Sequence, residues 1–490
     1  MDGGSRKRRG SDMDPAAAGR PPGPSAAKRF QVPRACQRCK ARRRGCDERR
    51  PCQRCLRAGL GEQCTASSAG AWPRASLVPD AGAVQVRVAE LAQAPVVDYC
   101  TQLFFELFHP TIPVLTTDHV ARLRAAAPFP ETGAEACSLL VAMCAHVLLH
   151  AELAGNGPPA SPTVLPEDPQ TYGRSLLDAA LAAHRRLHWH SAPTLDQCLL
   201  AFFLYAGQVR LARHSQAFRL LREATTLWAL VRDKRGDGGC TDALLDRLFW
   251  VLLISERSHA IRFDRSITLH ITSRTPNIGA HDVSLSGLWC LAALFRPIDS
   301  AFMAMKNGEV TASSPSPKLL EDAERAINAA IPPSAVLKDV QKSNLRITSL
   351  WLRVIIWQLR LRLGYLTETS YHHSLTYRYP LEIAKELTLS TRDLPIQSMH
   401  VHGIGLTEKL FDIASAVVDV LARVPHSPSI DHDRGVAIQR PPEDDLVYLR
   451  HLILQLPSGQ AVYNDLLEKH MHQALPSTML QGVISQYTPS

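Results

Sequence analysis

The stretch ACQRCKARRRGCDERRPCQRCLRAGLGEQC, residues 35–64, decides how the N-terminal part of this chain folds. It contains half of the chain's twelve cysteines, in two similar halves that each have a CxxC pair followed by a single cysteine. The six are Cys36, Cys39, Cys46, Cys52, Cys55 and Cys64. A CxxC pair at a turn or helix start directs two sulfurs at one point, which suits tetrahedral zinc.

Six thiolates cannot fill two separate four-coordinate sites, because those sites need eight ligands. Two sulfurs must then bridge two ions, and the similarity of the halves selects Cys36 and Cys52. Three disulfides or buried free thiols are the alternatives. A polar stretch this short has no core to bury thiols, and an intracellular setting disfavours disulfides. We predict two Zn(II) cofactors and a segment that is unfolded without them.

The positive charge is concentrated at the N-terminus. Residues 1–57 contain 17 Lys/Arg and 5 Asp/Glu. The rest of the chain contains 38 Lys/Arg and 41 Asp/Glu. Such a block favours a polyanionic partner, with nucleic acid ahead of an anionic membrane. Met1 is followed by charged residues and no apolar run, and apolar windows such as 139–149 are too short to span a membrane. We expect an intracellular protein with no membrane partner.

The densest basic run lies between Cys39 and Cys46. Its candidate DNA-contacting residues are Lys40, Arg42, Arg43 and Arg44. If residues 36–44 form a short helix, these side chains project from its exposed end. Arginine can bind guanine O6 and N7 in the major groove, and the other cations can bind phosphates. Charges that only solvate the surface or neutralise the cluster are the weaker alternative, because six thiolates and two Zn(II) carry a formal charge of only −2.

Residues 35–55 resemble the fungal Zn(II)2Cys6 binuclear cluster family of transcription regulators. The resemblance implies six cysteines on two zincs and a nuclear protein that binds double-stranded DNA. It assigns the reading of a CGG triplet to Arg43, and Arg42 matches a neighbouring DNA-contacting position. Pro51 matches the proline before the fourth cysteine, and Asp47 matches the acidic residue after the third. Gly45 stands where Lys or Arg is usual, which bears on the base preference.

The remainder of the chain reads as helices. Apolar residues recur at helical spacing over 199–230, 242–261 and 345–363, and no alternating strand pattern of comparable length occurs. We predict a small zinc-stapled N-terminal module, a large all-α regulatory domain and a disordered basic N-terminus. The predicted boundaries are a tail at 1–27, the zinc domain at 28–66, a linker at 67–82, the regulatory domain at 83–425, and a loop with C-terminal helices at 426–490.

The helical region resembles the fungal-specific middle homology region of the same regulators. The similar stretches are 105–115, 201–205, 221–226 and 249–261. The last of them is similar to regulators of maltose, sucrose and starch use, which implies an RNA polymerase II regulator of carbohydrate-utilisation genes. A regulator of a secondary-metabolite gene cluster and a zinc-stapled protein-interaction module stay open. No Walker A loop, HExxH or GxSxG motif is present, so we expect no enzyme.

Several further features have two interpretations. Glu256 and Arg257 follow an apolar run and form either a structural ion pair or an effector-linked latch. His146 and His150 lie one helical turn apart, and core histidines with satisfied hydrogen bonds are favoured over a metal site. Six scattered cysteines are expected to be small core residues: Cys100, Cys137, Cys144, Cys198, Cys240 and Cys290.

The sequence also leaves partners and signals open. Only about one heptad precedes Pro95, so binding is monomeric or the helical domain makes a homodimer contact. Arg6-Lys7-Arg8-Arg9 is a candidate nuclear import signal or a solvated charge run. Residues 443–445 are acidic and precede apolar residues, which indicates either an activation segment that contacts co-regulators or an acidic first helical turn.

Overall fold

The computed structural model describes residues 36, 38–39, 42, 44, 46–47, 49, 51–61, 64, 90–91, 93–129, 133–150, 164–165, 168–186, 192–235, 243–276, 283–309, 316–424, 441–477 and 480. The predicted tail at 1–27, the linker at 67–82 and the run Arg6-Lys7-Arg8-Arg9 lie outside these residues. The chain divides into two compact units, Met1–Pro79 and Asp80–Ser490.

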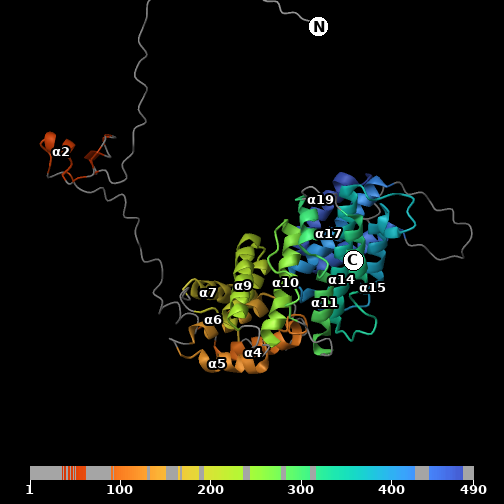
Figure 1. Ribbon diagram of the computed structural model, residues 1–490, viewed down its shortest axis with the longest axis horizontal. Coiled ribbons are helices and arrows are strands. Elements are labelled where there is room, and N and C mark those ends of the chain that lie inside the picture. The colour runs from red at the N-terminus through yellow and green to blue at the C-terminus, as the bar shows by residue number, and fades with distance from the viewer. Residues whose placement is uncertain are drawn as a thin grey trace, which may run out of the picture. The chain divides into compact units, whose positions relative to one another are not determined.

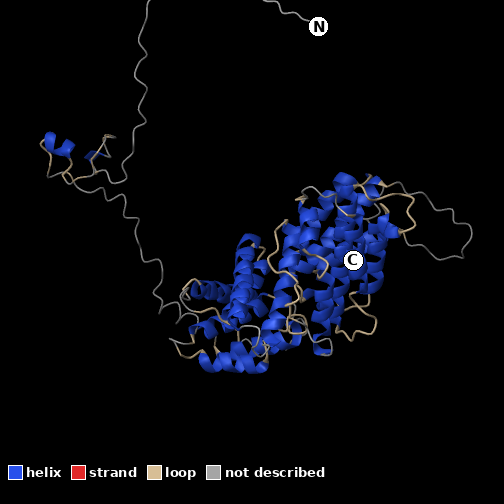
Figure 2. Ribbon diagram, in the orientation of Figure 1, coloured by secondary structure: helices blue, strands red, loops and turns tan. Residues whose placement is uncertain are grey.

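The described part of the second unit is helical and contains no strand, as predicted (Figure 2). Its helical elements include α4 (Ala94–Leu103), a π-helical turn η1 (Phe104–Phe108), α5 (Thr117–Ala126), α6 (Ala134–Leu149), α7 (Pro169–His184), α8 (Leu195–Arg210), α9 (His214–Arg235) and α10 (Ala243–Phe263). They continue with α11 (Ser286–Phe295), α12 (Ser300–Asn307), α13 (Pro317–Ala329), α14 (Asp339–Leu363), α15 (Tyr379–Thr391), α16 (Gln397–His400), α17 (Ile404–Arg423), α18 (Pro442–Gln455) and α19 (Asn464–Ala474).

Helix α6 forms the centre of the N-terminal half of this unit. It is apolar on all sides, and all of its residues from Ala136 to Leu149 are buried. A helix of that kind needs neighbours all round, and α6 packs against α4, α5, α7 and α8. Side-chain caps fix where the neighbouring helices begin: Thr116 caps α5, Asp168 caps α7 and Thr194 caps α8.

The C-terminal half is built around α14 and α17, which pack on each other and on α15. Figure 1 shows α10 and α11 between this half and the helices α4–α9. Helix α10 contacts α9 and α11, and α11 contacts α14, so these two helices connect the halves. The apolar side chains of both halves belong to one buried cluster.

Among the described residues, no single helix is long and apolar enough to span a membrane. The pair Val283–Phe295 and Ser300–Asn307 passes such a test only when combined, and it is bent by 53°.

The structure divides one of the apolar runs that the sequence predicts to be helical. The apolar run 199–230 is not one helix, because α8 ends at Arg210 and α9 begins at His214. Ala212 between them has φ 54°, and the amide of Arg213 bonds back to the carbonyl of Gln208. A helix cannot continue through a left-handed residue. By contrast, the run 345–363 lies inside α14 and ends with it.

The acidic residues 443–445 form the first turn of α18. Asp445 is buried, and Leu446 and Leu449 on the following turn are fully buried in the core. Carboxylates in a first turn are stabilised by the positive end of the helix dipole. The described residues therefore place this segment in the packed domain.

Candidate metal centre and DNA-binding surface

The six cysteines of the N-terminal unit come together in one buried cluster. The first CxxC pair lies on a short helical turn, in which the amide of Arg42 donates to the carbonyl of Arg38 at 3.1 Å. The second pair lies at helix α2 (Gln53–Arg57), where Cys52 is the N-cap residue. The two cysteines of each pair are three residues apart, and residues at that spacing lie on the same face of a helical turn. Both sulfurs of a pair therefore project from one face.

The two halves repeat the same contacts. The amide of the second cysteine in each CxxC donates to the sulfur of the first at 3.4 Å, in Cys39 to Cys36 and in Cys55 to Cys52. The amide of the first cysteine donates in turn to the sulfur of the lone cysteine of its half. That distance is 3.4 Å from Cys36 to Cys46 and 3.1 Å from Cys52 to Cys64. The halves are therefore related by a pseudo-two-fold.

The distances between sulfurs fit zinc. In a tetrahedral site with zinc–sulfur bonds of about 2.3 Å, neighbouring sulfurs are about 3.8 Å apart. The sulfur of Cys36 lies 3.9 Å from that of Cys52 and 3.8 Å from that of Cys55. The sulfur of Cys52 lies 3.8 Å from that of Cys39. Cys36 and Cys52 thus each contact two sulfurs of the other half, whereas Cys39 and Cys55 each contact one, and this is the position a bridging ligand needs.

The crowding of the thiols also favours a cation among them. Burial raises the pKa of Cys39, and the adjacent sulfurs of Cys36 and Cys52 raise it further. So many closely spaced thiols cannot ionise together unless positive charge lies among them. Zinc, which binds the thiolate form, supplies that charge.

Two polar residues near the cluster take roles that local spacing did not indicate. The guanidinium of Arg38 lies 3.7 Å from the sulfur of Cys55, 17 positions along the chain. The carboxylate of Asp47 accepts the amide of Gln53 at 3.1 Å and so holds the start of α2. Each contact joins one half of the unit to the other. The family pattern places an acid at Asp47, but only the folded unit shows its partner.

The candidate DNA-contacting residues are described in part. Arg42 and Arg44 are exposed and follow the first helical turn, and the amide of Arg44 closes that turn on the carbonyl of Cys39 at 3.0 Å. Lys40 and Arg43 lie outside the described residues. Arg42 and Arg44 are therefore free to meet a partner close to the buried sulfur cluster.

Residues 34–71 match the model of the fungal Zn(2)-Cys(6) binuclear cluster domain. The N-terminal unit of this chain is a binuclear zinc cluster domain. The match includes all six cysteines and the basic run between Cys39 and Cys46. Two zinc ions are accordingly the cofactors of this domain, as the sequence predicts.

Much of the chain is similar to fungal proteins of sugar use. A probable sucrose utilization protein of Candida albicans is 21% identical over 268 residues, which are 52% of each chain, so the match spans about half of that relative. A maltose fermentation regulatory protein of Saccharomyces cerevisiae is 21% identical over 432 residues, 81% of this chain and 86% of the relative. A respiratory transcription factor of the same yeast is 25% identical over 182 residues, 36% of this chain and 38% of the relative.

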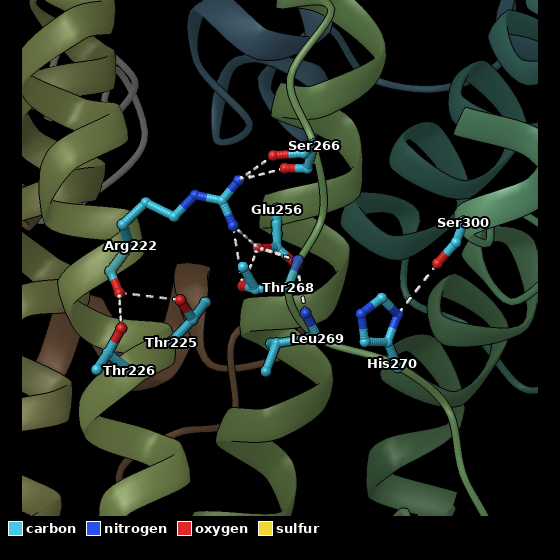
Figure 3. Close-up of polar contacts among 9 residues, drawn as sticks. All are labelled: Arg222, Thr225, Thr226, Glu256, Ser266, Thr268, Leu269, His270 and Ser300. Atoms are coloured by element: carbon cyan, nitrogen blue, oxygen red, sulfur yellow. Dashed lines mark hydrogen bonds and ion pairs between the residues drawn. The ribbon is translucent and has the colours of Figure 1, made fainter. Parts of the chain in front are cut away.

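In the helical unit, Glu256 and Arg257 are both buried but do not pair with each other. Glu256 accepts from the guanidinium of Arg222 at 2.6 Å and from the amides of Thr268 and Leu269, both at 2.9 Å (Figure 3). Arg257 donates instead to the carbonyl of Phe295 at 2.6 Å. Glu256 therefore joins α9, α10 and the segment after α10. This agrees with a structural ion pair, but the partner is Arg222 and not Arg257.

The two neighbouring histidines differ. His150 donates through Nδ1 to the carbonyl of His146 at 2.7 Å, as expected of a core histidine. Both ring nitrogens of His146 are buried without a hydrogen-bond partner among the described residues, which corrects the expectation that both histidines are satisfied. The described groups that could hold a metal all lie in the cysteine unit.

Five of the remaining cysteines are buried free thiols, as expected of core residues. They are Cys100, Cys137, Cys144, Cys198 and Cys290. Cys240 lies outside the described residues.

Buried neutral histidines make the helical unit sensitive to acid. Burial lowers the pKa of His150 and of His259 from 6.5 to about 4. Below pH 6.5 the unfolded chain therefore binds protons at these histidines that the folded chain does not bind. The free energy of unfolding is unaffected by them above pH 6.5 and decreases as the pH falls toward 4. We expect each histidine to contribute a loss on the order of 3 kcal/mol by the acidic end. Urea unfolding across this range measures it.

A matched variant isolates one histidine. The ring of His259 stacks on Phe218 at 5.2 Å between centroids, so His259→Phe keeps an aromatic ring but removes the titrating group. We expect a shallower dependence of the unfolding free energy on pH in this variant. A slope identical to that of the unmodified protein would contradict the assignment.

Proposed function

We propose that this protein is a sequence-specific DNA-binding transcription regulator of the RNA polymerase II type, which acts in the nucleus. It reads CGG-type triplets through the binuclear zinc cluster domain. Cys36, Cys39, Cys46, Cys52, Cys55 and Cys64 hold the two zinc ions, with Cys36 and Cys52 shared between them. The helical unit regulates this activity, and the proposal assigns no catalytic step to either unit.

One observation carries the proposal: exposed cations lie directly beside a buried metal-binding cluster. Arg42 and Arg44 are exposed at the end of the turn that presents Cys39, so the zinc ions would fix the backbone that carries them. In this arrangement Arg43 reads the base edges, while Lys40, Arg42 and Arg44 bind phosphates and set the register. The metal is thus structural, and the arginines contact the DNA.

The target genes we propose are those of carbohydrate utilisation. The support is similarity to proteins whose names refer to sucrose utilization and maltose fermentation, at 21% identity. Profiling the transcripts of a deletion strain on different sugars tests this part. Altered expression confined to a biosynthetic gene cluster would favour the rival assignment.

Replacing Arg43 tests the base-reading role. We expect Arg43→Ala to weaken binding to the preferred site by about 1–3 kcal/mol and to flatten the preference among sites. Binding is measured by fluorescence anisotropy with zinc-loaded full-length protein on CGG-containing and scrambled duplexes. The control is Arg57→Ala, which removes an exposed arginine from the end of α2, outside the basic run. This control variant should bind the CGG-containing and the scrambled duplex more weakly by the same small factor.

Unbiased site selection with the zinc-loaded chain completes the test. Enrichment of CGG-containing sites, with single or paired triplets, is the expected result and also reports monomer or dimer binding. Affinity should fall steeply with salt, because several phosphate contacts release counterions. A folded, zinc-loaded protein that enriches no sequence would favour a protein-interaction module instead.

A further inference from the structure

A partly open cavity of about 230 Å³ lies between helices of the helical unit. Residues of α6, α8, α10, α11, α14 and α17 line it, so it lies where the two halves of the unit meet. Its walls are mainly apolar, with aromatic rings from Phe108, Phe202 and Phe295. A second cavity of about 100 Å³ shares Tyr205 and Lys409 with it. Since a cavity of about 150 Å³ can hold benzene, a larger molecule has room here.

Lys409 of α17 lines both cavities. Its ammonium group donates to the hydroxyl of Thr348 at 2.8 Å and lies 5.4 Å from the ring centroid of Trp351. Among the described residues, no carboxylate lies within salt-bridge distance of it. The adjacent Glu408 pairs instead with Arg262 at 3.1 Å. Removal from water, and then the nearby Arg262, lower the pKa of Lys409 to about 7, and the more distant carboxylate of Glu408 only partly opposes them.

A buried ammonium group with no carboxylate at salt-bridge distance is costly. The larger cavity does not supply the missing charge, because its lining contains no aspartate or glutamate. The same lining includes a second cation, Arg210, which donates through Nε to the carbonyl of Leu149 at 3.0 Å. The cavity is therefore an apolar space with positive charge on its wall.

His146 is an independent sign that something binds here. Its side chain lines the cavity, is only 4% exposed, and has no hydrogen-bond partner at either ring nitrogen among the described residues. Burial holds the pKa of His146 well below its usual range, so the ring is neutral and offers one donor and one acceptor. Buried polar atoms without partners are rare and costly, and a bound molecule would satisfy them.

We propose that this cavity binds a small organic acid, with its apolar body against the aromatic walls and its carboxylate paired with Lys409. The carboxylate supplies the charge that the lining lacks, and the rings of Phe108, Phe202 and Phe295 provide an apolar surface for the rest of the molecule. A ligand there would contact both halves of the helical unit and would stabilise their present arrangement.

The test uses hydrocinnamate and its neutral analogue, hydrocinnamyl alcohol, with the full-length protein near neutral pH. Calorimetry and the thermal midpoint report binding. We expect a Kd of about 1 mM or tighter for the acid, given its size, and at least about tenfold weaker binding of the alcohol, because charge-assisted hydrogen bonds are the stronger ones. Equal affinities, or no binding of the acid, would overturn the proposal.

Lys409→Met keeps a long side chain and removes the ammonium group. It should fold, because it leaves no charge buried without a partner, and we expect it to bind acid and alcohol equally. Lys342→Met is the matched control, since Lys342 pairs with Asp339 at the surface, and it should keep the preference for the acid. A preference retained in Lys409→Met, or stabilisation by maltose and not by the acid, would contradict the assignment. No readout involves DNA, so failure here is separable from failure of the proposed function.

Discussion

Cys52→Ser is expected to remove zinc from the N-terminal unit and to weaken DNA binding by at least about 100-fold, since the zinc-binding free energy of such a unit is also its folding free energy. The sulfur of Cys52 contacts both halves: it lies 3.9 Å from that of Cys36 and 3.8 Å from that of Cys39, and it accepts the amide of Cys55. A shared ligand serves both ions, so its loss affects the whole cluster. Zinc content per chain and anisotropy on a CGG duplex measure the two effects.

Cys290→Ser is the matched control, because Cys290 is equally buried but lies in α11 of the other unit. It should retain two zincs and full DNA affinity. Helical circular dichroism should persist in Cys52→Ser, since the helical unit is compact by itself. One zinc per chain in the unmodified protein would refute the shared bridge, and two zincs in Cys52→Ser would remove this cysteine from the ligand set.

Glu256→Ala is expected to destabilise the helical unit by about 3–5 kcal/mol, the usual cost of removing one partner of a buried ion pair. Glu256 is 1% exposed, and its carboxylate accepts from Arg222 and from two backbone amides. Without it, the guanidinium loses its charged partner and both amides lose their acceptor. Arg222 would still donate to the backbone of Ser266, so the segment after α10 would keep only part of its anchor on α9 (Figure 3). Chemical denaturation followed by circular dichroism measures the change.

Arg325→Ala provides the comparison at the surface. Arg325 pairs with Asp322 at 2.7 Å, and its side chain is 73% exposed. Exposed pairs contribute little, so we expect a change below about 1 kcal/mol. Glu256→Gln should fall between the two, because the amide oxygen still accepts hydrogen bonds but carries no charge. A loss under 1 kcal/mol in Glu256→Ala would show that water replaces the carboxylate without cost.

The sequence by itself determined the metal chemistry and the helical class. Six cysteines at fixed spacing in a polar stretch leave few alternatives to a metal cluster, because their ligand geometry is set within a few residues of chain. Apolar residues at helical spacing determine α10 and α14 in the same local way. The family resemblance added the expected role of Arg43, which local spacing does not contain.

Only the tertiary structure decided which distant side chains meet. Arg38 reaches Cys55, Glu256 pairs with Arg222 rather than with its neighbour Arg257, and six helices line the cavity at Lys409. Sequence periodicity reports contacts one or two helical turns apart. The partner of a buried charge depends instead on how whole helices pack, and an unfilled space among them has no pattern of its own in the chain.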